Sequence, residues 1–169
     1  MAVIKNVNPL KEKSDLIQGW LDKQILNNTN ISGEFTKFRY GISYKRFTTG
    51  IMDSVLPEYP GRFSAWQTNS FYYYEIVLKN GKLFVQLACD INEQLPDAIR
   101  KVYDKVFPSL FGYKRNPERA YYCYAFGEKM PVSPETPDNA IIEYLDECFK
   151  KINGFESALI KLLTEMATA

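Results

Sequence analysis

The sequence predicts an α+β fold, in which helices cover one face of an antiparallel meander sheet. One observation is the stretch FYYYEIVLKNGKLFVQLACD at residues 71–90, which has the pattern of a β-hairpin. Another is that segments with apolar residues at every third or fourth position stand near both ends of the chain. Strands that follow one another in the middle of a chain, with helices around them, are typical of α+β domains.

The central hairpin is built around Asn80 and Gly81, the pair that best accommodates the positive φ angles of a type I′ turn. With these residues as the turn, Lys79 pairs with Lys82 and Leu78 pairs with Leu83. Side chains alternate between the two faces of a strand, so the register gives one apolar face and one mixed face. The apolar face contains Tyr72, Tyr74, Ile76, Leu78, Leu83, Val85, Leu87 and Cys89, and the mixed face contains Tyr73, Glu75, Val77, Phe84, Gln86 and Ala88.

Before the hairpin, residues 1–9 form a lead-in or an edge strand. Residues 14–26 predict an amphipathic helix with Ser14 as its N-cap, ended by an Asn-rich turn. Residues 35–46 alternate as one strand, which puts Lys37, Arg39, Ser43 and Lys45 on one face. A single helical turn at residues 50–55 and a strand at residues 62–67 follow.

After the hairpin, Pro96 begins a helix that Pro108 or Gly112 ends. Residues 114–118 predict a charged turn and residues 120–126 another strand. Residues 130–137 hold three prolines and form an extended linker, the one plausible internal boundary. We expect a single domain over residues 1–169 with a helical C-terminal subregion at 137–167, where Thr136 and Pro137 start one helix and Asn153-Gly154 separates it from the next.

The charge balance argues against a protein with a strong general affinity for nucleic acid or anionic membranes, because the net charge is +1. Its distribution is uneven. Residues 1–115 hold 16 Lys and Arg against 11 Asp and Glu, and residues 116–169 hold 5 against 9. The aromatic content of 15% is explained by aromatic-rich strands or by stacking on a ligand or partner.

The three cysteines, Cys89, Cys123 and Cys148, form no CxxC pair and no spaced ligand set, and each follows an apolar pattern. We expect them to be reduced core residues of a cytoplasmic protein. The sequence has no apolar run of about 18 residues and no secretory leader pattern, so neither a membrane span nor a membrane partner is expected.

The absence of histidine excludes Ser-His and Cys-His nucleophilic systems and histidine-based metal sites. No phosphate-binding glycine loop is present, and no lysine has Asp or Glu two positions before it, the spacing that a metal-dependent nuclease would need. Carboxylates remain as candidates, and Glu75 is interpreted as the cross-strand partner of Gln86. We expect no catalytic residue, metal or cofactor, while a histidine-free enzyme that uses carboxylates or tyrosines stays open.

Four short segments resemble the domain that follows the catalytic core in some bacterial and phage nucleases of the PD-(D/E)XK superfamily. They are residues 44–49 (YKRFTT), 64–66 (SAW), 73–76 (YYEI) and 83–87 (LFVQL), within a likeness over residues 35–165. The nuclease signature itself is absent. The resemblance therefore implies at most the accessory domain, in a bacterial or phage setting, with a role in binding and not in hydrolysis.

The leading functional hypothesis is a non-enzymatic binding module that acts on nucleic acid or on a protein of a nucleic-acid pathway. Basic side chains would contact phosphates and aromatic rings would stack on bases. The candidate residues are Lys37, Arg39, Lys45, Arg46, Trp66 and Tyr73. A solvated outer sheet face explains the same basic stripe, and a protein-interaction or homodimerisation domain, with an aromatic outer sheet face and acidic C-terminal helices, is the alternative function.

Overall fold

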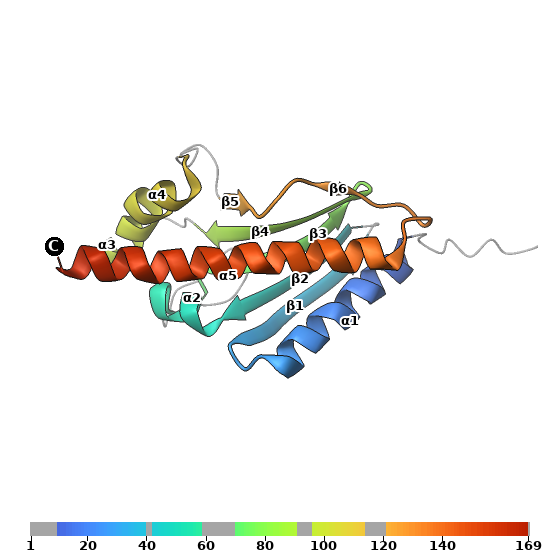
Figure 1. The fold of residues 1–169 in the computed structure, drawn as a ribbon, viewed down its shortest axis with the longest axis horizontal. Helices are drawn as coiled ribbons and strands as arrows, with labels where there is room; N and C mark the ends of the chain where they lie inside the picture. Colours follow the sequence, from blue (N-terminus) through green and yellow to red (C-terminus); the bar gives the residue numbers. More distant parts are fainter. Residues whose placement is uncertain (1–9, 40–41, 59–69, 91–95, 114–120, 169) are drawn as a thin grey trace, which may run out of the picture.

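The computed structural model describes residues 10–39, 42–58, 70–90, 96–113 and 121–168, with the backbone alone for residues 34–39, 121 and 122. Helices flank a sheet whose strands are consecutive along most of the chain (Figure 1). The elements are α1 (Lys11–Asn27), β1 (Ile31–Arg39), β2 (Ile42–Thr49), α2 (Gly50–Val55), β3 (Tyr72–Lys79), β4 (Lys82–Asp90), α3 (Asp97–Lys101), the π-helical turn η1 (Val102–Val106), α4 (Phe107–Phe111), β5 (Tyr121–Ala125), β6 (Met130–Pro131) and α5 (Asp138–Thr168).

The sheet is an antiparallel meander with the order β1-β2-β3-β4-β5, and the short β6 pairs with β4 next to the hairpin turn. This arrangement confirms the predicted α+β class. The segment interpreted as a linker, residues 130–137, is tied to the sheet at its start, since β6 lies against Lys82 and Leu83 and Val132 is buried. The predicted segments at 1–9, 62–67 and 114–118 lie outside the described residues.

The β3–β4 hairpin has the predicted turn and register. Asn80 and Gly81 adopt φ angles of 52° and 68°, as a type I′ turn requires. Lys79 pairs with Lys82 and Leu78 pairs with Leu83. Every residue of the predicted apolar face is buried in the main core.

Residues 35–46 do not form one strand, and this part of the prediction is wrong. The chain reverses between β1 and β2, so Lys37 pairs with Tyr44 and Arg39 pairs with Ile42. Lys45 pairs with Thr36 and Ile76. Lys45 therefore occupies the other set of register positions from Lys37 and Arg39, because a reversal inside an alternating run changes which residues share a face.

Helix α1 begins at Lys11, before the predicted start, and Ser14 is not its N-cap. Ser14 lies inside the first turns, where its hydroxyl donates to the Ser43 hydroxyl at 2.9 Å, and its backbone N–H donates to the carbonyl of Leu10. A serine before an apolar stripe resembles a cap in sequence, but this one faces β2.

The helical region after Pro96 runs through α3, η1 and α4 and ends at Gly112, which has a φ of 76°. Pro108 does not end it. Proline inside a helix lacks an N–H and crowds the carbonyl four residues earlier, and a π-helical turn can absorb such a break. Here η1 precedes Pro108, and the N–H of Phe107 donates to Val102.

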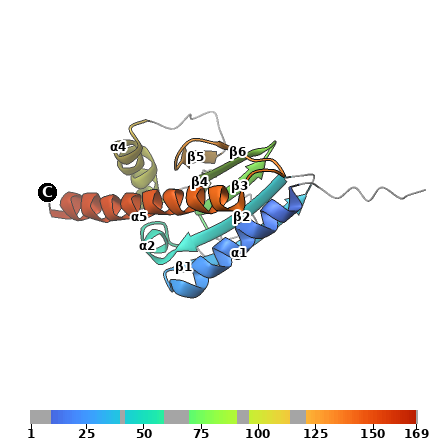
Figure 2. The same cartoon turned by 45° about the vertical axis from the view of Figure 1, so that its right-hand side comes forward.

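Helix α5 is one continuous helix of 31 residues, about 46 Å long at 1.5 Å per residue. The predicted break at Asn153-Gly154 is therefore wrong. Glycine costs a helix interior about 1 kcal/mol relative to alanine, and burial of Ile152 and Phe155 on either side offsets that cost. Figures 1 and 2 show α5 crossing one face of the sheet and projecting beyond it at its C-terminal end.

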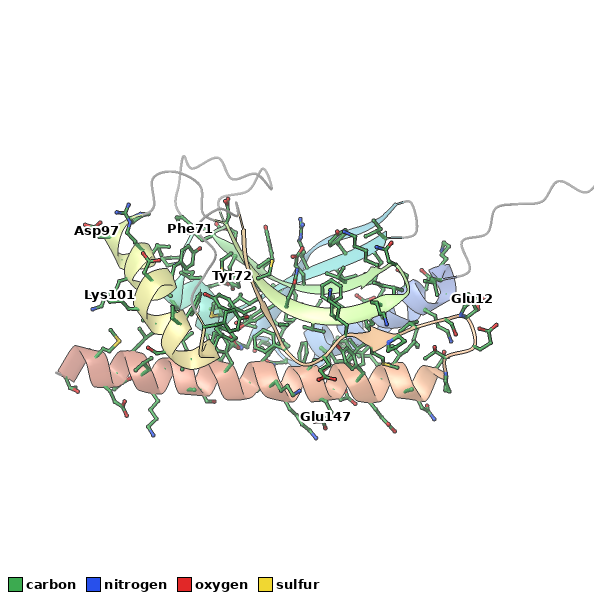
Figure 3. The ribbon with its side chains drawn as sticks, turned by 90° about the horizontal axis from the view of Figure 1, so that it is seen from above. Glu12, Phe71, Tyr72, Asp97, Lys101 and Glu147 are labelled. Carbon is green, nitrogen blue, oxygen red and sulfur yellow. The ribbon has the colours of Figure 1, made fainter. Side chains whose placement is uncertain are left out.

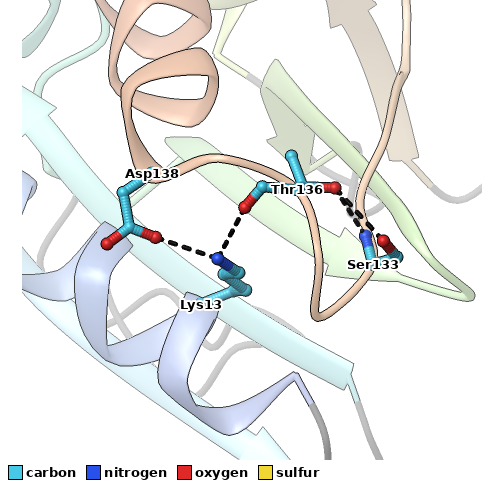
Figure 4. A network of polar contacts seen from close by, with 4 residues as sticks. All are labelled: Lys13, Ser133, Thr136 and Asp138. Carbon is cyan, nitrogen blue, oxygen red and sulfur yellow. Dashed lines mark hydrogen bonds and ion pairs between the residues drawn. The ribbon is translucent and has the colours of Figure 1, made fainter.

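Polar contacts hold the start of α5 against α1 (Figure 4). The Lys13 ammonium donates to the Thr136 carbonyl at 2.6 Å and to the Asp138 carboxylate at 2.9 Å. Further along the same interface, the Trp20 indole N–H donates to Asp146 at 3.0 Å. These contacts fix the line along which α5 passes over the sheet.

The cysteines are only partly as predicted. Cys89 and Cys148 are buried, whereas Cys123 is exposed on β5. Cys123 pairs with Ala88, a residue of the mixed hairpin face, so its register places it away from the helices. The apolar pattern around it did not show this because β5 is an edge strand in the described sheet.

Replacing Gly154 by alanine should stabilise the protein by about 0.5–1 kcal/mol, since a helical interior favours alanine and no atom lies within 4 Å of the added Cβ. Chemical denaturation measures the change. Gly112→Ala is the matched control, because its Cβ would also meet open space but its φ is 76°, so it should destabilise. A loss of stability in Gly154→Ala would contradict a continuous α5.

Candidate functional site

The residues that sequence reasoning selected do not form one exposed surface where the structure describes them. Lys45 is 5% exposed and Tyr73 is 1% exposed. The side chain of Lys45 extends from β2 to α1, where its ammonium donates to Gln18 at 3.2 Å. Burial lowers the pKa of Lys45, while Asp15 and Asp22 act in the opposite direction. Neither Lys45 nor Tyr73 offers a surface to a phosphate or a base in this structure.

Arg46 forms an ion pair with a residue on the neighbouring strand. Its Nε donates to Glu75 at 2.8 Å, and its guanidinium lies 5.7 Å from the centroid of the Tyr73 ring and 5.9 Å from that of Tyr44. Gln86 donates to the second oxygen of Glu75 at 3.1 Å, which confirms the predicted cross-strand contact. The Glu75 carboxylate is thus satisfied on both oxygens.

The mixed face of the hairpin is more buried than its polarity suggested. Tyr73, Glu75, Val77 and Ala88 are all buried, so β3 is enclosed on both faces, whereas many antiparallel strands keep one face in water. Tyr73, a candidate for stacking on a base, is therefore not exposed to solvent in this structure. Lys37 and Arg39 lie in β1, described by backbone alone, and Trp66 lies outside the described residues, so their proposed roles stay predictions.

A second polar cluster lies in the core where α2, β3 and α5 meet. Thr49 donates to the Glu156 carboxyl group at 2.6 Å, and the Tyr72 hydroxyl donates to Asp53 at 2.6 Å. The fully buried Tyr74 hydroxyl lies beside the same Glu156 carboxyl without a hydrogen bond of good geometry. Thr49 also caps α2 by accepting from the N–H of Met52. The cluster joins the short α2 to the middle of α5.

Burial raises the pKa values of two members of this cluster, Glu156 and Tyr72. It raises the pKa of Glu156, and the hydrogen bond from Thr49 opposes that rise. Burial and the hydrogen bond to Asp53 also raise the pKa of Tyr72. A signal for Glu156 is present in the sequence, because it stands four residues after Ile152 and three before Leu159, within the apolar stripe of α5.

The structure also has an open groove of about 420 Å³, here called the distal groove. It is formed by α2, the α3–η1 segment and the last turns of α5, three parts of the chain far apart in sequence. Its volume is within the usual range for ligand sites, about 300–1,000 Å³. The lining residues are Ser54, Val55, Ala98, Lys101, Val102, Val106, Ile160, Leu163, Met166 and Ala167.

The distal groove follows from the length of α5. Leu159 is the last fully buried residue of the helix among those described, and Ile160, Leu163 and Met166 lie beyond it with part of their apolar surface uncovered. Ile160 is 41% exposed. Figure 3 shows Lys101 extending from α3 on the side of this projecting end. The sequence predicts a helical turn at residues 50–55 and helices over the other two segments, but not that the three segments meet.

The described residues contain no group of three or more cysteine, aspartate or glutamate side chains that could hold a metal ion. In the same part of the chain, no helix combines the length and the apolar character needed to cross a bilayer. The acidic side chains near the sheet are instead paired, as Glu75 is with Arg46, or buried, as Glu156 is.

Arg46→Met should destabilise the protein by about 3–5 kcal/mol, because it leaves the buried Glu75 carboxylate without its ion partner. The double variant Arg46→Met/Glu75→Leu should recover part of the loss, as a denaturant double-mutant cycle would show. Lys150→Met breaks the exposed pair with Glu147 and should leave the stability almost unchanged, because water screens exposed ion pairs. Equal losses in the two single variants would contradict a structural role for Arg46.

Comparison of the chain with protein-family models, with curated proteins and with solved structures found no match. The resemblance to a nuclease accessory domain therefore rests on the short sequence segments alone. Three of those segments lie in β2, β3 and β4, which form consecutive strands of the sheet.

Proposed function

We propose that the protein is a non-enzymatic binding module that holds an apolar group of its ligand in the distal groove. One observation carries the proposal: three separate elements line an open groove of about 420 Å³ with mostly apolar side chains. Ligand sites are commonly concave and apolar with a few polar groups. Exposed Ile160 lies at this groove and gives apolar surface that a ligand would cover.

The state of the reactive side chains supports binding over chemistry. Glu75 accepts from Arg46 and Gln86, and Tyr72 donates to Asp53. Burial raises the pKa of the Cys89 thiol, which disfavours the nucleophilic thiolate. None of these groups lines the distal groove. A ligand in the groove would therefore meet none of them as an acid, a base or a nucleophile.

This proposal keeps the expectation of a binding module and moves its binding surface. The predicted surface included Lys45 and Tyr73, which are buried, and Arg46, which is paired with Glu75. Binding to nucleic acid, a role in a nucleic-acid pathway and formation of a homodimer stay predictions from the sequence. Lys37 and Arg39 on β1 are the basic residues on which the first of these still rests.

Filling the distal groove should weaken binding of a small apolar probe. We expect the full-length protein to bind the neutral dye N-phenyl-1-naphthylamine saturably, with fluorescence enhancement. Ala98→Phe and Ala167→Phe place a ring in the groove from two different walls and should each weaken binding at least about ten-fold, a change of about 1.4 kcal/mol.

The matched control is Ala158→Phe, which makes the same change at an exposed position of α5 that does not line the groove. It should bind the dye as the unaltered protein does. Circular dichroism and thermal unfolding establish that all three variants are folded. Unchanged dye affinity in both groove variants would overturn the proposal.

A further inference from the structure

The distal groove contains a single charged side chain, that of Lys101, among the residues that line it. Within the part of the chain that the structure describes, no hydrogen bond or ion pair engages the Lys101 ammonium. The neighbouring lysine on η1, Lys105, is also exposed but does not line the groove. One cation at the edge of an apolar hollow is complementary to a ligand with one anionic group and an apolar body.

We propose that the distal groove binds a single-chain anionic amphiphile, with its carboxylate at Lys101 and its alkyl chain against Leu163 and Met166. This inference rests on the proposed function, since it assigns a ligand class to the same groove. The apolar walls account for the alkyl chain, because burial of each methylene group away from water is favourable. The positive charge of Lys101 accounts for a negatively charged head group.

The charge and size of the groove disfavour other occupants. A nucleic acid would need several cations along its path, and the groove lining has one. A stable protein partner typically covers about 20–30 residues on each side, whereas ten of the described residues line the groove. An alkylammonium ligand would place its charge against the ammonium of Lys101.

The lysine is also placed to let an amphiphile enter without burying its charge. Lys101 is exposed, whereas Val102 and Val106 on the same segment are buried and form the apolar wall. A carboxylate at Lys101 therefore stays in contact with water, while the alkyl chain of the ligand is removed from water. Exposed ion pairs contribute little to affinity, so the lysine selects among ligands that the apolar walls bind.

Titration of the full-length protein with decanoate, decanol and decylammonium, each kept below its aggregation concentration, tests the inference. Amide chemical shifts in ¹H–¹⁵N spectra report both the affinity and the location. Decanoate should bind more tightly than decylammonium and shift amides of α3, η1 and the last turns of α5. Lys101→Gln should weaken decanoate roughly three- to five-fold, the effect of an exposed ion pair, and leave decanol unchanged.

Lys105→Gln removes an equivalent charge one helical turn away and should leave decanoate affinity within about 1.5-fold, as expected for an exposed charge without a direct partner. Equal binding of the three ligands, or an equal loss in both lysine variants, overturns the anionic amphiphile and leaves the proposed function intact. If decanol does not shift groove amides, the proposed function fails. Tighter binding by an apolar peptide with a free C-terminal carboxylate overturns the small amphiphile in favour of a chain terminus.

Discussion

The structure depends on the burial of one stripe of α5 against the apolar face of the sheet. The stripe contains Ile141, Leu145, Cys148, Ile152, Phe155 and Leu159. Phe155 lies within 6 Å of the ring centroids of Phe107, Phe111 and Phe126, and Phe149 lies 4.7 Å from Trp20. The helix thereby joins the α1 side of the core to the α4 side. Without it, the apolar face of the β3–β4 hairpin would be open to water.

The same helix also explains two other features of the molecule, the buried carboxyl group of Glu156 and the distal groove. Its stripe contains Glu156, which brings a carboxyl group into the core, where Thr49 donates to it. Its last turns extend past Leu159, so their apolar positions have no sheet to cover and instead form one wall of the distal groove. A shorter α5 would remove that wall. A longer sheet would cover the apolar positions of the last turns and fill the groove. The candidate binding surface is thus a consequence of a mismatch in length between helix and sheet.

The sequence predicted elements that local chemistry determines. Asn80-Gly81 fixed the hairpin register because few other pairs tolerate its backbone angles. Local patterns failed where tertiary packing decided. Asn153-Gly154 resembles a helix end, yet it lies within α5 because its neighbours are buried on the sheet. The run at residues 35–46 alternates smoothly across a chain reversal, so Lys45 was assigned to the wrong face.

The candidate site was beyond sequence reasoning for a related reason. The sequence predicts a helical turn at residues 50–55 and helices that include residues 98–106 and 160–167, and nothing in any one of these segments indicates the other two. Lys101 is one of several lysines on amphipathic helices and becomes distinctive only through its place at the groove. Arg46 shows the converse, since a basic residue on a strand indicated a ligand contact and proved to be the partner of buried Glu75.

Native-state amide hydrogen exchange along α5 is the most direct test of this account. It shows whether the middle of the helix is part of the core and whether its last turns are only partly covered. The account predicts that amides at residues 145–159 exchange only through global opening, with the same free energy as the centre of β3 and β4. Amides at residues 162–168 should exchange orders of magnitude faster, through local fraying. A loss of protection at Asn153-Gly154, with residues 155–159 exchanging as fast as the last turns, would contradict it.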